Sequence, residues 1–155
     1  MDSYRLAGVY TGRVLKGALG IELQVHEVTG SENLIKALDA AQSWRVEGMN
    51  VLASPTLHAL RRPIIEQAAT RRLPAIYQWG ESAREGALLS YGPFRTDVYQ
   101  GLARHLARVL KGANPAELPV EQPTRFELVI NLNTAKTLGL AISPLLLARA
   151  DEVIE

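Results

Sequence analysis

The sequence predicts an α/β domain built around a mostly parallel sheet. Two observations carry this prediction: patterns typical of strands and of helices alternate along the chain, and the connections between them are short. The length of 155 residues suits one domain, and 47% apolar and 21% charged residues are typical of a globular protein. We therefore expect a hydrophobic core that needs no disulfide or metal ion for its stability.

The first third of the chain is predicted to form a helix, a strand, a second helix and a second strand. Apolar residues fall near helical spacing over residues 3–17, and residues 21–28 alternate as in a strand. Ser31 is suited to cap a helix that ends near Gly48. The apolar run of residues 49–53 then fits a strand that is covered on both faces.

Pro63 indicates where the next helix begins. Proline is tolerated at the first helical position and disrupts a helix interior, so we expect a helix from Arg62 to Arg72. Residues 54–61 are then left as a loop after a strand. Farther along, the patterns predict a strand, one helical turn and another strand, over residues 73–77, 81–85 and 87–91.

The longest predicted helix covers residues 96–111, after a Gly92-Pro93 turn. Its apolar residues share one face: Val98, Leu102, Leu106, Val109 and Leu110. A loop with three prolines follows. The remaining segments are a strand over residues 126–132, a helix over 134–138 capped by Asn131 or Asn133, a short helix over 144–147 and a terminal extension over 151–155.

Composition and motifs argue against several classes of function. A net charge of +1 gives no sign of a nucleic-acid partner, and the absence of cysteine excludes thiolate chemistry. His26, His58 and His105 do not have the spacing of a metal site, and no phosphate-binding glycine loop is present. No loop combines a nucleophile with a base or pairs two carboxylates. We expect no metal, no cofactor and no catalysis.

The beginning of the sequence does not resemble an export signal. Basic residues interrupt the apolar positions of residues 1–20, whereas a signal peptide needs an unbroken apolar stretch. No other stretch approaches the length of a membrane span. Taken as written, the sequence predicts a cytoplasmic protein.

Three loops follow predicted strands, at the place where open α/β sheets bind ligands. Ser54 and Thr56 in the first can bind a carboxylate or phosphate, or simply cap a helix. The second loop, residues 77–81, offers aromatic rings, an amide and a carboxylate. It can stack an aromatic ligand and hold its amine, or pack on the edge of the domain. The third, residues 90–93, can be only a turn.

Several stretches resemble a known protein family. They are RLPAIY (72–77), LLSYGP (88–93), VLKGANPAELPVEQPTRFELVINLNTAKTLGL (109–140) and LLLARADEVIE (145–155). These stretches resemble the C-terminal half of bacterial ABC-transporter substrate-binding proteins, in the group associated with tryptophan and tyrosine uptake. Residues 21–71 follow the same plan more loosely.

The resemblance implies a type I periplasmic binding fold, in which two lobes close on a solute. Each lobe is a three-layer α/β sandwich with a parallel sheet, and here the C-terminal lobe would be accompanied by a piece of the first lobe. The implied division is an incomplete C-terminal lobe over 1–91, a first-lobe segment of long helix and loop over 92–121, and a return strand and helices over 122–155. The chain would cross between lobes at four hinge residues: Gly92, Pro93, Gln122 and Pro123.

The resemblance also implies partners and a location. In the family the closed protein docks on an ABC permease in the membrane, and its location is periplasmic. The chain lacks nearly all of the first lobe, so the usual cover of the long helix is absent. We therefore expect the apolar face of this helix to mediate self-association, or to fold back over the sheet.

The function predicted from the sequence is solute binding for an ABC-type importer, in truncated form and without catalysis. The solute would be small and amino-acid-like or aromatic. The alternative is a non-catalytic interaction module, a half-domain that forms a homodimer through its long helix and unpaired sheet edge. The predicted ligand-binding residues are Ser54, Thr56, Tyr77, Gln78, Trp79, Glu81 and Tyr91.

Overall fold

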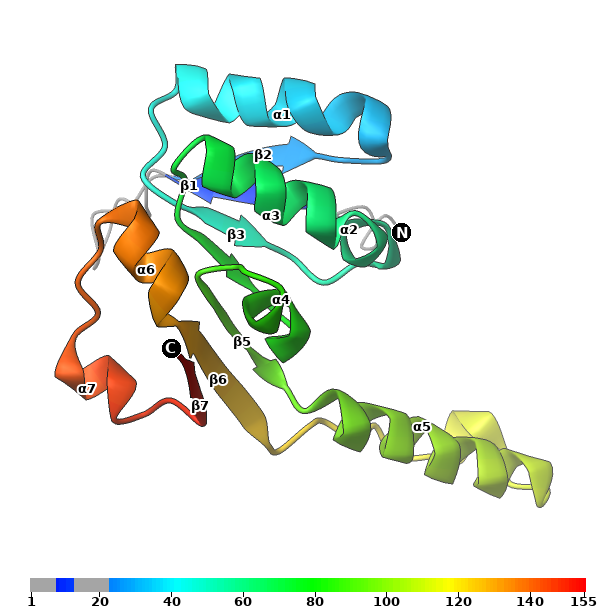
Figure 1. Ribbon diagram of the computed structural model, residues 1–155. Helices are drawn as coiled ribbons and strands as arrows, with labels where there is room; N and C mark the ends of the chain where they lie inside the picture. Colours follow the sequence, from blue (N-terminus) through cyan, green and yellow to red (C-terminus); the bar gives the residue numbers. More distant parts are fainter. Residues whose placement is uncertain (1–7, 13–22) are drawn as a thin grey trace.

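The computed structural model describes residues 8–12 and 23–155 of the chain (Figure 1). The described strands are β1 (Gly8–Gly12), β2 (Leu23–Glu27), β3 (Met49–Val51), β4 (Ala75–Tyr77), β5 (Leu89–Pro93), β6 (Phe126–Asn131) and β7 (Glu152–Ile154). The described helices are α1 (Ser31–Ser43), α2 (Pro55–Ala59), α3 (Arg61–Thr70), α4 (Gly80–Arg84), α5 (Arg95–Leu110), the 3₁₀ turn η1 (Pro115–Glu117), α6 (Leu132–Leu138) and α7 (Pro144–Leu147). None of these helices is long and apolar enough to cross a membrane.

All described strands belong to one sheet with the order β2-β1-β3-β4-β5-β6-β7. Strands β3, β4 and β5 are parallel neighbours, β6 runs antiparallel to β5, and β7 is parallel to β6. The five strands from β3 to β7 are therefore mostly parallel. Strand β1 pairs antiparallel with both β2 and β3. The α/β class predicted from the alternating patterns is confirmed.

The main core lies between the sheet and helices α1, α2 and α3. Alternation along β3 and β4 turns Met49, Val51, Ala75 and Tyr77 toward these helices. The helices contribute the apolar residues of their inner faces to the same cluster, among them Leu34, Leu38, Leu57, Ile64, Ile65 and Ala68. Asn50 points to the opposite face of the sheet and is exposed. The expectation that this strand is covered on both faces is therefore wrong.

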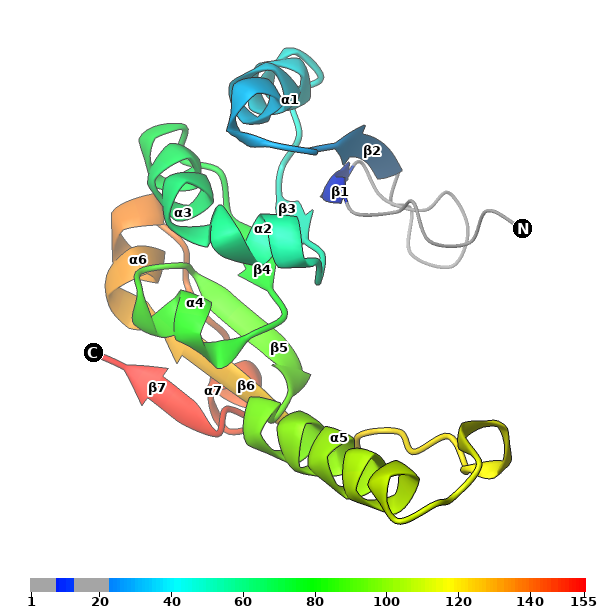
Figure 2. The same cartoon turned by 90° about the vertical axis from the view of Figure 1, so that its right-hand side faces the viewer.

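Helix α5 leaves the body of the protein (Figures 1 and 2). It starts directly after β5, and the chain returns through residues 111–125 to β6, which pairs with β5. The pairing continues one step past the strands, because the Phe94 amide donates to the Arg125 carbonyl oxygen at 3.2 Å. None of the residues of α5 is buried. The helix has not folded back over the sheet.

Two predicted helices begin or end differently in the structure. Residues 8–12, predicted as part of a helix over 3–17, form strand β1, which is hydrogen-bonded on both sides by β2 and β3. The rest of that predicted helix lies outside the described residues. Helix α1 starts at Ser31 itself, and the Asn33 side chain accepts hydrogen bonds from the amides of Thr29 and Gly30. It ends at Ser43 rather than near Gly48.

Three other segments differ from their predicted structure. The predicted loop over residues 54–61 contains helix α2, because Ser54 caps it and Pro55 occupies its first turn. The predicted turn at Gly92-Pro93 belongs to β5, whose ladder with β6 reaches Pro93. The C-terminal extension contains strand β7, which pairs with β6 in parallel. Each segment gains structure from a cap or a partner strand.

Candidate functional site

The ends of three parallel strands meet at one edge of the sheet. Because β3, β4 and β5 run in the same direction, the segments that follow them emerge side by side. Residues 52–54 connect β3 to α2, Gln78 and Trp79 connect β4 to α4, and Phe94 connects β5 to α5. This edge is where the sequence analysis placed the ligand.

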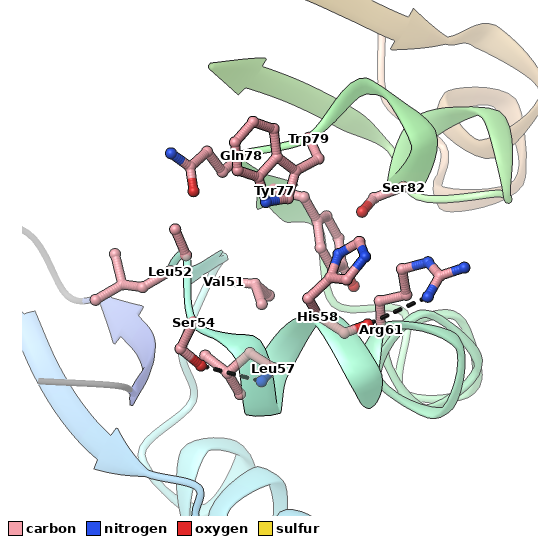
Figure 3. A pocket seen from close by; sticks show the side chains of 11 residues that line it. Val51, Leu52, Ser54, Leu57, His58, Arg61, Tyr77, Gln78, Trp79 and Ser82 are labelled. Atoms are coloured by element: carbon pink, nitrogen blue, oxygen red, sulfur yellow. Dashed lines mark hydrogen bonds between the residues drawn. The ribbon is translucent and has the colours of Figure 1, made fainter. Parts of the chain in front are cut away.

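A small hollow, here called the strand-end pocket, opens between these loops (Figure 3). It is lined by Val51, Leu52, Ala53, Ser54, Leu57, His58, Arg61, Tyr77, Gln78, Trp79 and Ser82. Its free interior measures about 20 Å³, which is room for one water molecule or one oxygen atom of a ligand. In this conformation the pocket admits one polar group and no complete solute.

A wider hollow adjoins the strand-end pocket. It measures about 340 Å³ and is lined by Asn50, Val51, Leu52, Ala53, Ile76, Tyr77, Gln78 and Tyr91. Five of these residues also line the strand-end pocket: Val51, Leu52, Ala53, Tyr77 and Gln78. A volume of this size is within the usual range for small-molecule sites. The two hollows together form a narrow recess beside a broad open one.

The structure brings only one of the two predicted hydroxyl residues into this site. Ser54 lines the strand-end pocket, and its Oγ accepts a hydrogen bond from the Leu57 amide at 3.0 Å. Its main role is therefore the capping of α2, the simpler of the two interpretations of this loop. Thr56 lies in α2 and is not among the residues that line either hollow.

Tyr77 occupies a different position from the stacking platform that the sequence suggested. Its side chain is 3% exposed and belongs to the main core, where its ring packs below the pocket. Its hydroxyl is buried and has no hydrogen-bond partner among the described residues. This burial raises the pKa of the Tyr77 phenol above its ordinary value. The hydroxyl therefore stays protonated and can donate a hydrogen bond.

Gln78 and Trp79 follow Tyr77 and form the upper wall of the pocket (Figure 3). The Gln78 Oε1 atom is buried without a partner in the described part of the chain. The backbone here is held close to β5, since a Cβ atom at Gly92 would collide with the carbonyl oxygen of Gln78. Trp79 is half-buried at the N-cap of α4. Glycine at position 92 therefore allows the Gln78 backbone to lie this close to β5.

Glu81 is engaged elsewhere. Its Oε1 forms an ion pair with the Arg95 guanidinium at the start of α5, and it does not line either hollow. Its other carboxylate oxygen is buried and has no partner among the described residues. The structure thus places Glu81 at the junction between α4 and α5. Its charge also acts on the pocket, because the pKa of the Arg61 guanidinium is raised by the hydrogen bond to Glu85 and further by the charges of Glu85 and Glu81.

Tyr91 and the predicted hinge residues lie along the strands that lead to α5. Tyr91 is exposed, lines the wider hollow and stacks on Phe126 with 5.7 Å between ring centroids. Gly92 and Pro93 are the last residues of β5 and pair with Glu127 and Phe126. The other two predicted hinge residues, Gln122 and Pro123, belong to the exposed return segment beside α5.

His58 and Arg61 are among the pocket residues that were not predicted as site residues. His58 belongs to α2, and Arg61 starts α3 one residue after the turn at Leu60. Arg61 donates from Nη2 to Glu85 at 2.8 Å and from Nη1 to the His58 carbonyl oxygen at 3.3 Å. The sequence offers one signal for Arg61 as a pocket residue: it is a basic residue three positions after His58, close behind the strand-end loop. The described residues contain no cluster of His, Asp and Glu side chains suited to a metal ion.

The comparison with protein families identifies the chain. A sequence model described as "ABC transporter substrate binding protein" matches residues 17–154. The chain belongs to this family. The resemblance noted in the sequence is thereby confirmed, and it extends over nearly the whole chain. A search of curated proteins found no match to this ABC substrate-binding chain.

Solved structures support the periplasmic-binding fold. A conserved domain protein from Vibrio cholerae O1 biovar El Tor is 25% identical with a TM-score of 0.73, over 81% of this chain and 42% of that one. An ABC domain in complex with L-Trp from Streptococcus pneumoniae is 23% identical with a TM-score of 0.72, over 82% of this chain and 44% of that one. A ligand-free, open substrate-binding protein with adhesive properties from Clostridium difficile is 15% identical with a TM-score of 0.54, over 82% and 42% of the two chains.

The ABC substrate-binding chain spans less than half the length of these structures. It therefore matches a part of the fold that they contain.

Proposed function

We propose that this chain is the solute-binding part of an ABC-type importer, and that it binds a small aromatic or amino-acid-like solute without catalysis. The observation that carries the proposal is the family match over residues 17–154, in a fold whose strand ends open into two adjoining hollows. The partner is the permease of the importer, and the working compartment is the periplasm.

The residues at the strand ends suit an aromatic solute. Trp79 lines the strand-end pocket and Tyr91 lines the wider hollow, and Leu52 and Gln78 line both. An aromatic ring can stack or pack edge-on against such side chains with a useful gain in affinity. The L-Trp in the complex of the pneumococcal ABC domain supports a solute of this kind. Glu81 would contribute only if its ion pair with Arg95 opened.

The first prediction tests solute binding through the two tryptophans of the chain. Trp79→Ala is expected to weaken L-tryptophan binding at least about fivefold, because a ring face worth roughly 1 kcal/mol or more is removed from the pocket wall. Trp44→Ala serves as the matched control, since Trp44 is exposed at the end of α1 and away from the strand ends. Ligand-detected NMR with millimolar L-tryptophan or L-tyrosine measures both variants.

The affinity of the chain alone is expected to be weak, near millimolar. Affinity for small solutes depends on enclosure, and these hollows are open on one side. Absence of binding by either amino acid, or equal binding by the wild type and Trp79→Ala, would contradict the proposed site.

A second candidate function is a non-catalytic interaction module that dimerises. The observation in its favour is helix α5, whose Tyr99, Leu102, Leu106 and Leu110 are all more than half exposed. Such a surface is unusual on a monomer. This candidate requires a stable dimer in solution and no response of the strand-end pocket to solutes.

A further inference from the structure

The strand-end pocket contains unused hydrogen-bond donors. Arg61 and Tyr77 both line this pocket, and two of their polar atoms, Arg61 Nε and the Tyr77 hydroxyl, are buried and have no hydrogen-bond partner among the described residues. Figure 3 shows the Tyr77 ring running beside His58 with its hydroxyl end toward Arg61. A buried polar group without a partner destabilises the fold, so two such groups on residues that line one recess indicate that something else satisfies them.

The two donors differ in charge and complement each other. Arg61 carries a permanent positive charge, and its Nη atoms are occupied by Glu85 and the His58 carbonyl oxygen. Among its nitrogen atoms, Nε is the one that is buried without a partner among the described residues. The Tyr77 phenol is neutral and remains a donor because burial disfavours its ionised form. A cationic donor beside a neutral donor suits an anionic oxygen.

The size of the recess limits what this anion can be. About 20 Å³ accommodates one oxygen atom, and the wider hollow of about 340 Å³ shares five wall residues with it. A free phosphate or sulfate would place several charged oxygens where there is room for one. A carboxylate at the end of a larger molecule fits better, since one oxygen enters the recess while the rest of the molecule lies in the wider hollow.

We propose that Arg61 and Tyr77 form the receptor for the carboxylate of the solute, with Arg61 Nε and the Tyr77 hydroxyl as its donors. This inference rests on the proposed function and adds the class of solute: a carboxylic acid whose apolar part lies toward Leu52 and Tyr91. It also replaces the hydroxyls of Ser54 and Thr56 as the predicted carboxylate ligands, because Ser54 caps α2 and Thr56 lines neither hollow.

A pair of related probes tests the carboxylate directly. L-tryptophan and tryptamine share the indole ring and the amine, and tryptamine lacks the carboxylate. Binding of both to the complete chain is measured by the same NMR titration. Tryptamine is expected to bind at least about tenfold more weakly, which corresponds to the loss of charge-assisted hydrogen bonds.

Variants then assign the effect to the two residues. Arg61→Gln and Tyr77→Phe are each expected to weaken tryptophan binding, by about tenfold and about threefold, and to change tryptamine binding by less than about twofold. Arg62→Gln is the matched control, since Arg62 also pairs with Glu85 but its side chain is 71% exposed and lines neither hollow. Amide NMR spectra establish that each variant is folded, and Tyr77→Phe decides the outcome if Arg61→Gln is not.

The outcomes separate this inference from the proposed function. If Trp79→Ala weakens tryptophan binding while Arg61→Gln and Tyr77→Phe leave the ratio of tryptophan to tryptamine affinity unchanged, the carboxylate receptor is wrong and the solute-binding function stands. The donors then hold only ordered water. If neither probe binds to the wild-type chain, the inference and the proposed function both fail.

Discussion

Tyr77 combines a core role with a role at the pocket. Strand alternation turns it to the same side as Ala75, so its ring fills the space beneath α2 and α3. Tyr77 also lines the strand-end pocket, and its hydroxyl is buried without a partner among the described residues. A single buried atom therefore connects the stability of the fold to the chemistry of the site.

The burial of Tyr77 predicts a stability change in alkali. Its folded pKa is raised above the unfolded value of about 10, so the unfolded state loses its proton first as the pH rises. The stability contribution is complete below about pH 10 and decreases above it, by about 1.4 kcal/mol per pH unit. Tyr77→Phe is expected to lack this decrease. Urea denaturation between about pH 9 and 11 measures the free energy of unfolding.

Tyr91→Phe is the matched control for the alkaline experiment. Tyr91 is 55% exposed, so its removal should leave the pH dependence of the wild type unchanged. Parallel stability curves for the wild type and Tyr77→Phe across this range would show that the phenol is not held in its neutral form.

At the scale of elements, we expect the junction between α5 and the sheet to act as a hinge. Two chain crossings lie side by side there, joined by the Phe94–Arg125 hydrogen bond. The Arg125 guanidinium also lies over the Phe94 ring, 4.5 Å from its centroid, and approaches Asp97 at 3.6 Å. Glu81 and Arg95 connect α4 to the first turn of α5. Because Gly92 is paired within β5 and packed on Gln78, bending is expected to begin at Phe94.

We predict that residues 94–121 move as a unit relative to residues 24–91. Glu81→Gln is expected to increase the amplitude of this motion, because it removes the charge that attracts Arg95. Residual dipolar couplings and ¹⁵N relaxation measure the motion. Arg104→Gln is the matched control, since its ion pair with Glu121 lies within the moving unit. Uniform, low mobility across both junctions in the wild type and in Glu81→Gln would contradict a hinge.

At the scale of the whole molecule, the apolar face of α5 is exposed, and none of the residues of α5 is buried by the described part of the chain. Leu102 is 62% exposed and Leu110 is 78% exposed, although both belong to the apolar face predicted from the sequence. Burial of one leucine contributes about 1.5–3 kcal/mol, so several on one face favour association. The chain spans 42–44% of the two most similar structures described above, and those longer chains contain further segments.

We predict that the chain self-associates through α5 at high concentration. The double change Leu102→Lys with Leu106→Lys is expected to weaken this association by at least about tenfold, since two charges replace apolar contacts. Leu145→Lys on α7 is the matched control, because Leu145 is 69% exposed but lies away from α5. Light scattering and sedimentation measure the oligomeric state. A monomeric chain with fast amide exchange along α5 would contradict self-association. It would also contradict stable burial of the apolar face of α5 by another part of the chain.

The sequence by itself determined the class of the fold and the strand-end loops at which the site is proposed. Helix α5, strand β6 and the cap at Asn131 were predicted within a few residues, because periodicity and capping depend on neighbours along the chain. The strand-end position of Gln78 and Trp79 followed from the alternation of strands and helices.

Only the tertiary structure decided which strands pair and which side chains from different elements come together. Strand β1 was predicted as a helix because its short pattern fits both forms, and pairing with β2 and β3 selects the strand. Arg61 and Tyr77 line one pocket, and Glu81 pairs with Arg95, although the members of each pair come from different elements. A local pattern reports which side of an element is apolar, whereas contacts between elements depend on how their surfaces pack. For this reason the sequence predicted the strand-end loops and Tyr77, but not the presence of Arg61 in the same pocket.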